Sequence, residues 1–313
     1  MGTRITTKHA KYLWLGVPLL GLAELLAHCY FSKRYPTFDE WRALKGEVGA
    51  LRQDHDLVVI APEWAEPLAR SALSDSLMPI ADVARADESG YRRAIEVSAL
   101  AHENPLIAAW PATTEKRVGK FTLRTRRNPA FRPPLYVLND HAAPPDLSVS
   151  ERHPDGQTTA CSYGTRPPSS ASGLLARPAF PRQRFACGPA EGNFVGTTII
   201  DDQDDRARRC LWANPSAGGL LTLTFAQVPI GERLYGYVGF SHFRFRDPGW
   251  PPVSLSFAID GVELGKHSHR PESGWRPFEL STAEYRGTTR EVRIEIWGAD
   301  SRELELCFYA ATR

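Results

Sequence analysis

Residues 253–267 read VSLSFAIDGVELGKH, with two strand-like runs on either side of Asp260 and Gly261. A two-residue Asp-Gly loop favours a type I′ turn, because glycine readily adopts the positive φ that this turn requires. Serine alternates with larger apolar residues before the turn, as in a strand with one buried face. The sequence therefore predicts a β-hairpin of two antiparallel strands.

Other short segments on either side of this hairpin have the same strand-like character. They are residues 194–200, 220–225, 233–240, 275–280, 291–297 and 303–309. In one of them, Val292, Ile294 and Ile296 alternate with charged residues, which predicts one buried face and one solvated face. Seven or more short strands separated by turns are typical of an antiparallel β-sandwich, which we expect over residues 190–313.

The order of these segments resembles jelly-roll modules of the galactose-binding type. The resemblance rests on the hairpin at Ile259-Asp260-Gly261-Val262, the stretch Gly274-Trp275-Arg276-Pro277-Phe278, the strand at 291–297 and a cysteine-bearing last strand. It implies a jelly-roll-like sandwich that binds glycans or acts as a spacer. Ligand contacts in such modules lie on variable loops, so the resemblance assigns no ligand residue here.

Residues 37–131 have the pattern of a small α/β domain. Thr37 and Glu40 form a capping-box signature at the start of a helix, and residues 57–62, LVVIAP, are typical of a strand buried on both faces. Helices are predicted at 63–73 and 89–100, and strands at 107–110 and 121–125. Residues 132–189 are rich in Pro, Ser and Gly, and we expect them to connect the two domains.

The α/β segment also resembles, loosely, the soluble domain that follows the membrane region of multi-pass glycosyltransferases that use lipid-linked sugars. The likeness covers the amphipathic helix after Thr37, the strand DLVVIAP and a short segment that ends at Trp110. It implies a cell-envelope setting and no particular activity, because this sequence lacks the many membrane helices that carry catalysis in those enzymes.

The segment Tyr12–Phe31 reads YLWLGVPLLGLAELLAHCYF. A helix of about 20 apolar residues spans the roughly 30 Å hydrocarbon core of a bilayer. The sequence therefore predicts a single-pass protein in which residues 1–36 form a cytoplasmic tip and a transmembrane anchor in contact with membrane lipid. Basic residues before the segment slightly outnumber those after it, which favours a cytoplasmic N-terminus and a periplasmic or extracellular body.

Glu24 is an unusual residue for such an anchor, because a carboxylate within a bilayer is costly. One interpretation is a buried carboxyl that docks a partner transmembrane helix, and the other is a protonated or snorkelling group. A cleaved signal peptide, or lipidation at Cys29 after the lipoprotein-like sequence Leu26-Ala27-His28, is an alternative for the whole segment.

Four of the five cysteines lie beyond this segment. An even number of cysteines in an extracytoplasmic body predicts two disulfides, and three connectivities are possible. We expect Cys161 to pair with Cys187 and Cys210 to pair with Cys307, the alternative being four reduced, buried thiols. Cys307 falls on the polar face of the last predicted strand, so its bridge is expected outside the sandwich core or at a twisted strand end.

Charge and motif content narrow the possible functions. The chain has 38 Lys and Arg against 36 Asp and Glu, a formal net charge of +2, which offers no field for nucleic-acid binding. It contains no Gly-x-Ser-x-Gly elbow, no His-Glu-x-x-His, no phosphate-binding loop and no dinucleotide glycine fingerprint. No cofactor is predicted, and an enzyme of a familiar class is disfavoured.

A few residues remain as candidates for ligand contact. Trp250 lies in a proline-rich turn that favours an exposed indole, and Tyr235 and Tyr237 are possible neighbours; folding of Trp250 onto the core is the alternative. His267 and His269 place two imidazoles on one strand face, as in a metal site or a polar strand end. The run 201–205, DDQDD, fits either a cation site or a solvated hairpin.

Three functions are therefore carried forward. The first is a noncatalytic binding or assembly protein of the bacterial cell envelope, with a glycan or an envelope protein as its partner. The second is an enzyme or accessory subunit of surface-polysaccharide assembly. The third is a structural subunit of a larger membrane complex.

Overall fold

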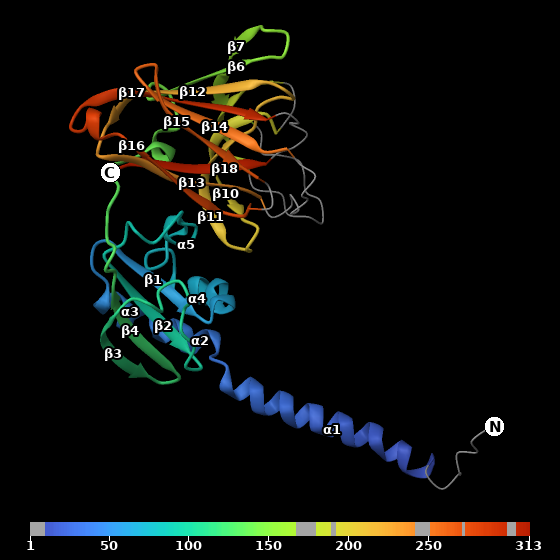
Figure 1. Cartoon of the computed structure of the whole chain (residues 1–313). Helices are drawn as coiled ribbons and strands as arrows, with labels where there is room; N and C mark the ends of the chain where they lie inside the picture. The colour runs from blue at the N-terminus through green and yellow to red at the C-terminus, as the bar shows by residue number, and fades with distance from the viewer. Residues whose placement is uncertain (1–9, 167–179, 189–191, 242–250, 271–272, 299–304) are drawn as a thin grey trace, which may run out of the picture. The chain divides into compact units, whose positions relative to one another are not determined.

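A computed structural model describes residues 10–166, 180–188, 192–241, 251–270, 273–298 and 305–313. The chain divides into two compact units. The α/β unit comprises Met1–Pro79 and Arg92–Pro129, and the β-sandwich unit comprises Ile80–Tyr91 and Ala130–Arg313. The segment Ile80–Tyr91 thus belongs to the second unit, although the segments directly before and after it belong to the first. Each unit has its own sheets (Figure 1).

The α/β unit contains one four-stranded mixed sheet in the order β1-β2-β4-β3. Strands β1 and β2 are parallel, and the other pairs are antiparallel. Its elements are α1 (Ala10–Arg34), α2 (Phe38–Ala43), α3 (Lys45–Leu51), β1 (Asp56–Ala61), η1 (Glu63–Ala65), α4 (Glu66–Leu73), β2 (Arg93–Ala99), β3 (Ala112–Val118) and β4 (Phe121–Arg127).

The predicted capping box is present at the start of α2. The Thr37 side chain accepts a hydrogen bond from the Glu40 backbone N–H, and the Glu40 carboxylate accepts one from the Thr37 backbone N–H at 2.7 Å. Trp41 then packs its ring edge-to-face on Phe121 of β4, with ring centroids 4.6 Å apart. The cap and this aromatic contact fix α2 against the sheet.

Two predicted elements of this unit are wrong. Residues 89–100, expected as a helix, contain strand β2, and residues 107–110, expected as a strand, form turns. Strand β2 is buried on both faces from Ala94 to Ala99, so it lacks the polar-apolar alternation that identifies a half-exposed strand. A short buried run cannot be distinguished from a helix by its periodicity.

The predicted membrane anchor at Tyr12–Phe31 is not supported. Its residues do form a helix, α1, and the described side chains from 16 to 30 are all exposed; the side chains of 12–15 and 31 lie outside the described part. Among the residues that the structure describes, no helix is long and apolar enough to cross a membrane.

The β-sandwich unit has two sheets whose strand pairs are antiparallel. One has the order β16-β13-β18-β11-β10-β9-β8, with β5 paired to β18, and the other has the order β15-β14-β17-β12-β6-β7. The elements are α5 (Ile80–Val83), β5 (Tyr136–Val137), η2 (Leu138–His141), β6 (Leu147–Arg152), β7 (Thr158–Ala160), β8 (Ser162–Thr165), β9 (Gln183–Ala186), β10 (Phe194–Asp201), β11 (Ala207–Ala213), β12 (Leu220–Pro229), β13 (Arg233–Phe240), β14 (Val253–Ile259), β15 (Val262–His269), β16 (Arg276–Ser281), η4 (Ala283–Tyr285), β17 (Thr289–Gly298) and β18 (Leu306–Thr312).

The Asp260-Gly261 hairpin is confirmed as the connection between β14 and β15. Both turn residues have positive φ, 47° for Asp260 and 82° for Gly261, as a type I′ turn requires. Val292, Ile294 and Ile296 of β17 are fully buried between the sheets, as their alternation predicts. Local sequence signals therefore identify these three strands of the sandwich.

The stretch expected as a connection, residues 132–189, contributes β5 to β9 to both sheets. The described prolines there, such as Pro133, Pro144 and Pro154, lie outside the strands, and the strands are short, which weakens the strand signal in the sequence. The pair Leu147 and Val149 of β6 reaches the main core, so this stretch is part of the sandwich.

Both predicted disulfides are confirmed: Cys161 bonds to Cys187, and Cys210 bonds to Cys307. Cys307 lies on the opposite face of β18 from Leu306 and Phe308, so the second bridge is buried with an aromatic cluster outside the main core, as expected from its strand position. Two disulfides indicate an extracytoplasmic location, because cytosolic proteins keep their thiols reduced.

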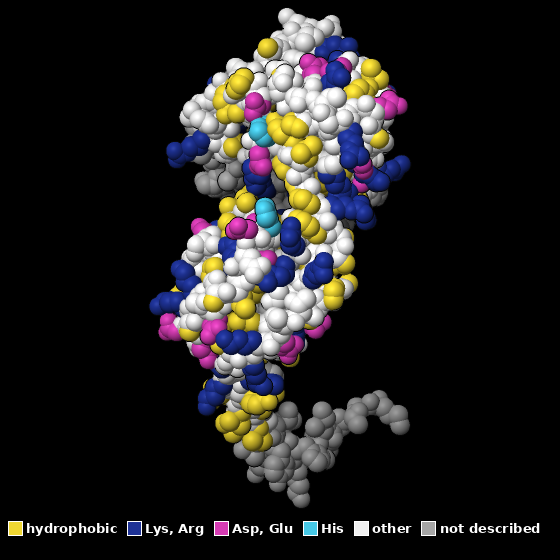
Figure 2. All heavy atoms as spheres, turned by 90° about the vertical axis from the view of Figure 1, so that its left-hand side faces the viewer, with side chains coloured by type: hydrophobic (Ala, Val, Ile, Leu, Met, Phe, Trp, Pro, Cys, Tyr) yellow, Lys and Arg dark blue, Asp and Glu magenta, His cyan; other side chains and the backbone are white. Residues whose placement is uncertain are grey.

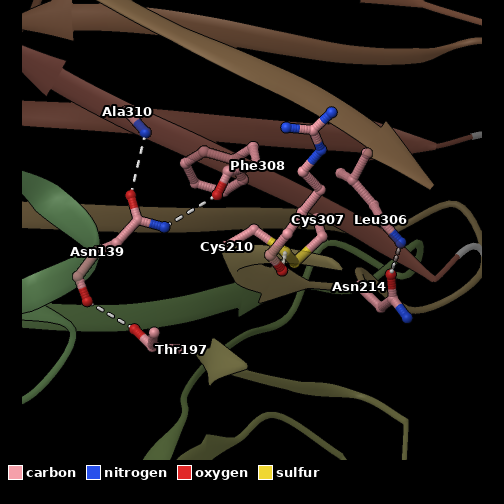
Figure 3. Close-up of a disulfide and its surroundings, with 9 residues drawn as sticks. Asn139, Thr197, Cys210, Asn214, Leu306, Cys307, Phe308 and Ala310 are labelled. Carbon is pink, nitrogen blue, oxygen red and sulfur yellow. Dashed lines mark hydrogen bonds between the residues drawn. A yellow bond between two sulfur atoms is a disulfide. The ribbon is translucent and has the colours of Figure 1, made fainter. Parts of the chain in front are cut away.

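A buried asparagine fastens the strands near this bridge (Figure 3). The Asn139 side chain donates to the Phe308 carbonyl at 3.0 Å and accepts from the Ala310 N–H at 3.1 Å. Its own carbonyl accepts from the Thr197 hydroxyl at 2.6 Å. Asn139 therefore links the loop after β5 to two strands of one sheet, and all of these polar groups are satisfied.

Candidate functional site

The residues singled out from the sequence do not form one site among the described residues. Tyr235 and Tyr237 alternate along β13 with Leu234 and Val238, which point into the main core, so the tyrosines lie on the outer face of that sheet. His267 and His269 are paired with core residues of β14 on the inner side of the other sheet. Trp250 lies outside the described residues.

The two tyrosines are covered by the segment Ile80–Tyr91. Asp87 accepts a side-chain hydrogen bond from Tyr237 and, together with burial, raises the pKa of that phenol. The Tyr237 ring also stacks on Trp275, whose indole N–H donates to the Ala86 carbonyl at 3.1 Å. These side chains hold a chain segment in place and offer no open surface to a ligand.

The two histidines lie between the edge strands of the sheets. His269 is only 2% exposed and stacks on Phe240, and His267 contacts Phe278. Burial lowers the pKa of His269 to about 4, and the charges of His267 and Arg276 add to this effect. Within the described part of the chain, no three His, Cys, Asp or Glu side chains are grouped as a metal site requires.

The buried imidazole makes stability depend on pH. The pKa of His269 is about 4 in the folded protein against 6.5 for a free histidine, so the unfolded chain binds the proton more readily. The contribution of neutral His269 to the free energy of unfolding is complete above pH 6.5. It decreases by about 3 kcal/mol as the pH drops toward 4. Urea unfolding from pH 4 to 7 should show this slope, and His269→Gln should flatten it.

The matched control for that experiment is His153→Gln, in the hairpin between β6 and β7, where the imidazole contacts Thr159 at an accessible position. We expect its unfolding profile to follow the unmodified chain. An unchanged pH slope in His269→Gln would contradict the assignment of the slope to this residue.

The acidic run 201–205 has a structural role at Asp202. This carboxylate is buried, accepts from the Asp204 and Arg206 backbone N–H groups, and pairs with Arg208 at 2.7 Å. Its oxygens are thus occupied by donors of the protein, as in the hairpin interpretation.

An apolar cavity in the α/β unit is the first feature with the geometry of a ligand site. Its volume is about 250 Å³, and it opens where β1 and β2 end. Trp64 of η1 is 64% exposed, and its ring meets Tyr35 edge-to-face at 5.7 Å. The remaining walls come from Pro36, Trp41, Ala65, Leu68 and Ala99. Ligands of open α/β sheets bind at this edge, beyond the carboxyl ends of parallel strands.

A second cavity, of about 610 Å³, shares Tyr35 with the first. Four of its lining residues carry basic side chains: Arg34, His102, Arg117 and Lys120. Its described lining includes no carboxylate. Arg117 and Lys120 meet the loop after β2 there because β3 ends and β4 begins at the same sheet edge, with Val118 paired to Phe121 and Phe121 paired to Ala99.

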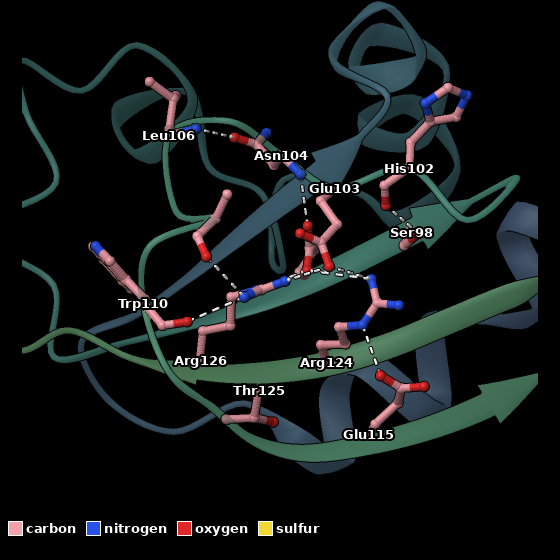
Figure 4. Close-up of polar contacts among 12 residues, drawn as sticks. Ser98, His102, Glu103, Asn104, Leu106, Trp110, Glu115, Arg124, Thr125 and Arg126 are labelled. Carbon is pink, nitrogen blue, oxygen red and sulfur yellow. Dashed lines mark hydrogen bonds and ion pairs between the residues drawn. The ribbon is translucent and has the colours of Figure 1, made fainter.

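A buried ion network holds the loop that forms one wall of this basic cavity (Figure 4). Glu96 of β2 is fully buried; its carboxylate accepts from the Arg126 guanidinium at 2.8 Å and from the Asn104 backbone N–H at 2.6 Å. The Ser98 hydroxyl donates to the His102 carbonyl at 2.5 Å. Residues 100–102 are therefore fixed in position, with Leu100 and Ala101 both at positive φ.

The basic cavity is a local feature of a surface with mixed charge. On the face shown in Figure 2, Lys and Arg side chains lie among Asp and Glu side chains over both units, in keeping with the net charge of +2. A long polyanion therefore has no continuous track to follow, and we attribute to the cavity the binding of a small group only.

The sequence contained one usable signal for this site. Trp64 follows directly after the buried strand of residues 56–61, at the position where ligand-binding residues of α/β sheets occur. Arg34, Arg117 and Lys120 are far from Trp64 in the sequence; strand pairing brings Arg117 and Lys120 to the site, and Arg34 lies at the end of α1.

Comparison with known proteins gives no relative by sequence, since no protein-family model and no curated protein matches the chain. Among solved structures, the CBM51-2 and INT domains of Clostridium perfringens ZmpB align over 37% of this chain and 26% of that chain, with 9% identity and a TM-score of 0.26. The same CBM51-2 domain in complex with GlcNAc aligns over 53% and 37%, with 11% identity and a TM-score of 0.27.

A CBM51 module from Clostridium perfringens GH95 in complex with methyl-galactose aligns over 37% of this chain and 77% of that chain, with 8% identity and a TM-score of 0.25. This chain spans about a quarter to a third of the first two structures. These are distant structural similarities to CBM51 modules with a galactose-binding-like β-sandwich, and we transfer no residue from them.

Proposed function

We propose that this protein is an extracytoplasmic glycan-binding protein and that the apolar cavity of its α/β unit holds a sugar ring. The observation that carries the proposal is the exposed indole of Trp64, set against Tyr35 beside a preformed cavity of about 250 Å³. Sugar rings present apolar C–H faces, which pack on aromatic side chains, while their hydroxyls face polar groups at the rim.

The exposure of Trp64 is itself an argument for binding. The side chain leaves 64% of its surface in water although it belongs to a folded element. Large aromatic side chains at such positions contribute much of the affinity of binding surfaces. Glu63 and Glu66 are neighbours of Trp64 in the sequence but line neither cavity, so the indole face is the main feature that the cavity offers.

We expect Trp64→Ala to weaken glycan binding by about tenfold or more, because an anchor of this kind contributes at least about 1.4 kcal/mol. The free energy of unfolding should change little, since the residue is largely exposed. The measurement is a glycan array of the full chain, followed by calorimetric titration of the saccharides that bind.

Trp297→Ala is the matched control. Trp297 of β17 is also an exposed tryptophan, 44% accessible, but it belongs to the sandwich. We expect this variant to bind as the unmodified chain does. Loss of binding in Trp297→Ala with none in Trp64→Ala would move the site to the sandwich, and no bound glycan at all would refute the proposal.

A further inference from the structure

We infer that the glycan recognised by this protein is acidic: a sugar whose carboxylate or phosphate enters the basic cavity while its ring lies on Trp64. The inference rests on the proposed function and adds the chemical class of the ligand. The observation that supports it is that the two cavities adjoin. Tyr35 lines both of them, Ala99 lines the apolar cavity, and the next residue, Leu100, lines the basic cavity.

Two hydrogen bonds hold the Lys120 ammonium in place and leave one of its N–H donors available. Its ammonium donates to the Glu40 carboxylate at 3.1 Å and to the Tyr35 carbonyl at 3.3 Å. An ammonium has three N–H donors, so one remains for a ligand. Glu40 in turn caps Thr37, and the Thr37 N–H and Lys120 lower the pKa of that carboxyl, which keeps it ionised and the lysine anchored.

Arg117 supplies the main positive charge toward the ligand. It lies on β3, lines the cavity and has no ion-pair partner among the described residues. Arg34, whose guanidinium lies over the Tyr30 ring at 5.2 Å, lines the cavity from the end of α1. A guanidinium binds a carboxylate or phosphate through two parallel hydrogen bonds, which neutral sugars cannot match.

Two carboxylates next to lining residues, those of Glu40 and Glu103, do not cancel the charge of this cavity. Glu40 is held by Thr37 and Lys120, as described above. Glu103 follows His102 in the loop, but its carboxylate pairs with Arg126 at 3.2 Å and lies 3.8 Å from Arg124. Both acids are therefore already paired, and Arg34 and Arg117 leave the cavity with a net positive charge.

The test is titration of the full chain with sets of sugars that share a ring: glucose, glucuronic acid and glucose 6-phosphate, and the corresponding galactose series. We expect the acidic forms to bind about tenfold more tightly than the neutral sugar at 50 mM NaCl and this preference to shrink at 300 mM. Arg117→Gln should remove most of the preference, because it weakens binding of the acidic sugars far more than binding of the neutral sugar.

Arg42→Gln is the matched control, because Arg42 is an exposed arginine of α2 in the same unit that lines neither cavity. It should keep the preference. Comparison of the uronic acid with the 6-phosphate of each sugar separates a carboxylate site from a phosphate site.

The other possible outcomes contradict the inference, the proposed function or both. Equal affinity for neutral and acidic sugars, or an unchanged preference in Arg117→Gln, would overturn the inference and leave the proposed function intact. Inorganic phosphate bound as tightly as glucose 6-phosphate, with no effect of Trp64→Ala, would refute the sugar site and leave an anion site. No binding of any probe would overturn both.

Discussion

Replacement of both Cys210 and Cys307 by alanine is expected to lower the free energy of unfolding of the sandwich by about 4.7 kcal/mol, from the loop-closure entropy of a loop of 97 residues. The bridge joins neighbouring strands, β11 and β18, that lie far apart in the sequence. Without it, the unfolded chain gains many conformations while the folded chain keeps its strand pairs. Denaturant unfolding followed by circular dichroism measures the loss.

Two further variants serve as controls. The second bridge, Cys161–Cys187, closes a loop of 26 residues, so its removal should cost about 3.5 kcal/mol by the same relation. Cys29→Ser, at the exposed free cysteine, should change nothing. If the shorter loop proves the more stabilising, loop closure does not explain the effect.

Glu96→Ala is expected to destabilise the α/β unit by about 3 to 5 kcal/mol, because it removes the acidic partner of a buried guanidinium. Arg126 is only 5% exposed and, besides the Ala108 and Trp110 carbonyls, would retain one described carboxylate partner, Glu103, which lies at the surface. The Asn104 backbone N–H would lose its acceptor as well. Thermal unfolding of the variant, compared with the unmodified chain, gives the measurement.

The control for Glu96 is Glu115→Ala in the same network. Glu115 pairs with Arg124 at 2.8 Å, but its side chain is 60% exposed, so the expected loss is below about 1 kcal/mol. Equal losses in the two variants would show that burial does not set the strength of this network.

The Glu96 variant also tests how the site is built. The network holds the loop of residues 100–104, and residues 100–102 form one wall of the basic cavity. We expect binding of acidic sugars to weaken in Glu96→Ala even at temperatures where the unit remains folded. Neutral sugars, held mainly at Trp64, should be affected less.

The fold was predictable where the signal is local. The capping box at Thr37 and Glu40, the buried strand at 56–61 and the Asp260-Gly261 hairpin all appear in the structure, because each depends on residues close in the sequence. The expected disulfide pairing is also present: Cys161 and Cys187 close a loop-rich stretch, and Cys210 and Cys307 join the first and last parts of the β domain. Length and a high leucine content predicted a transmembrane anchor at Tyr12–Phe31, which the described part of the chain does not support.

The site was not predictable, because it depends on strand pairing. Tyr235 and Tyr237 were proposed as ligand residues, but the segment that covers them, Ile80–Tyr91, is contributed from the middle of the other unit's sequence. No local sequence pattern indicates that a segment within the sequence of one unit packs in the other. In the same way, Arg117 and Lys120 reach the cavity only because β3 and β4 form a hairpin beside β2.

The central claim is that an acidic sugar binds where the indole of Trp64 and the basic cavity meet. The most direct test is a crystal structure of the full chain with the acidic saccharide that binds most tightly. We predict that its ring packs on Trp64 and that its carboxylate or phosphate lies within hydrogen-bond distance of Arg117 or Lys120. A saccharide bound on the sandwich at Trp297, with both cavities of the α/β unit empty, would contradict the account.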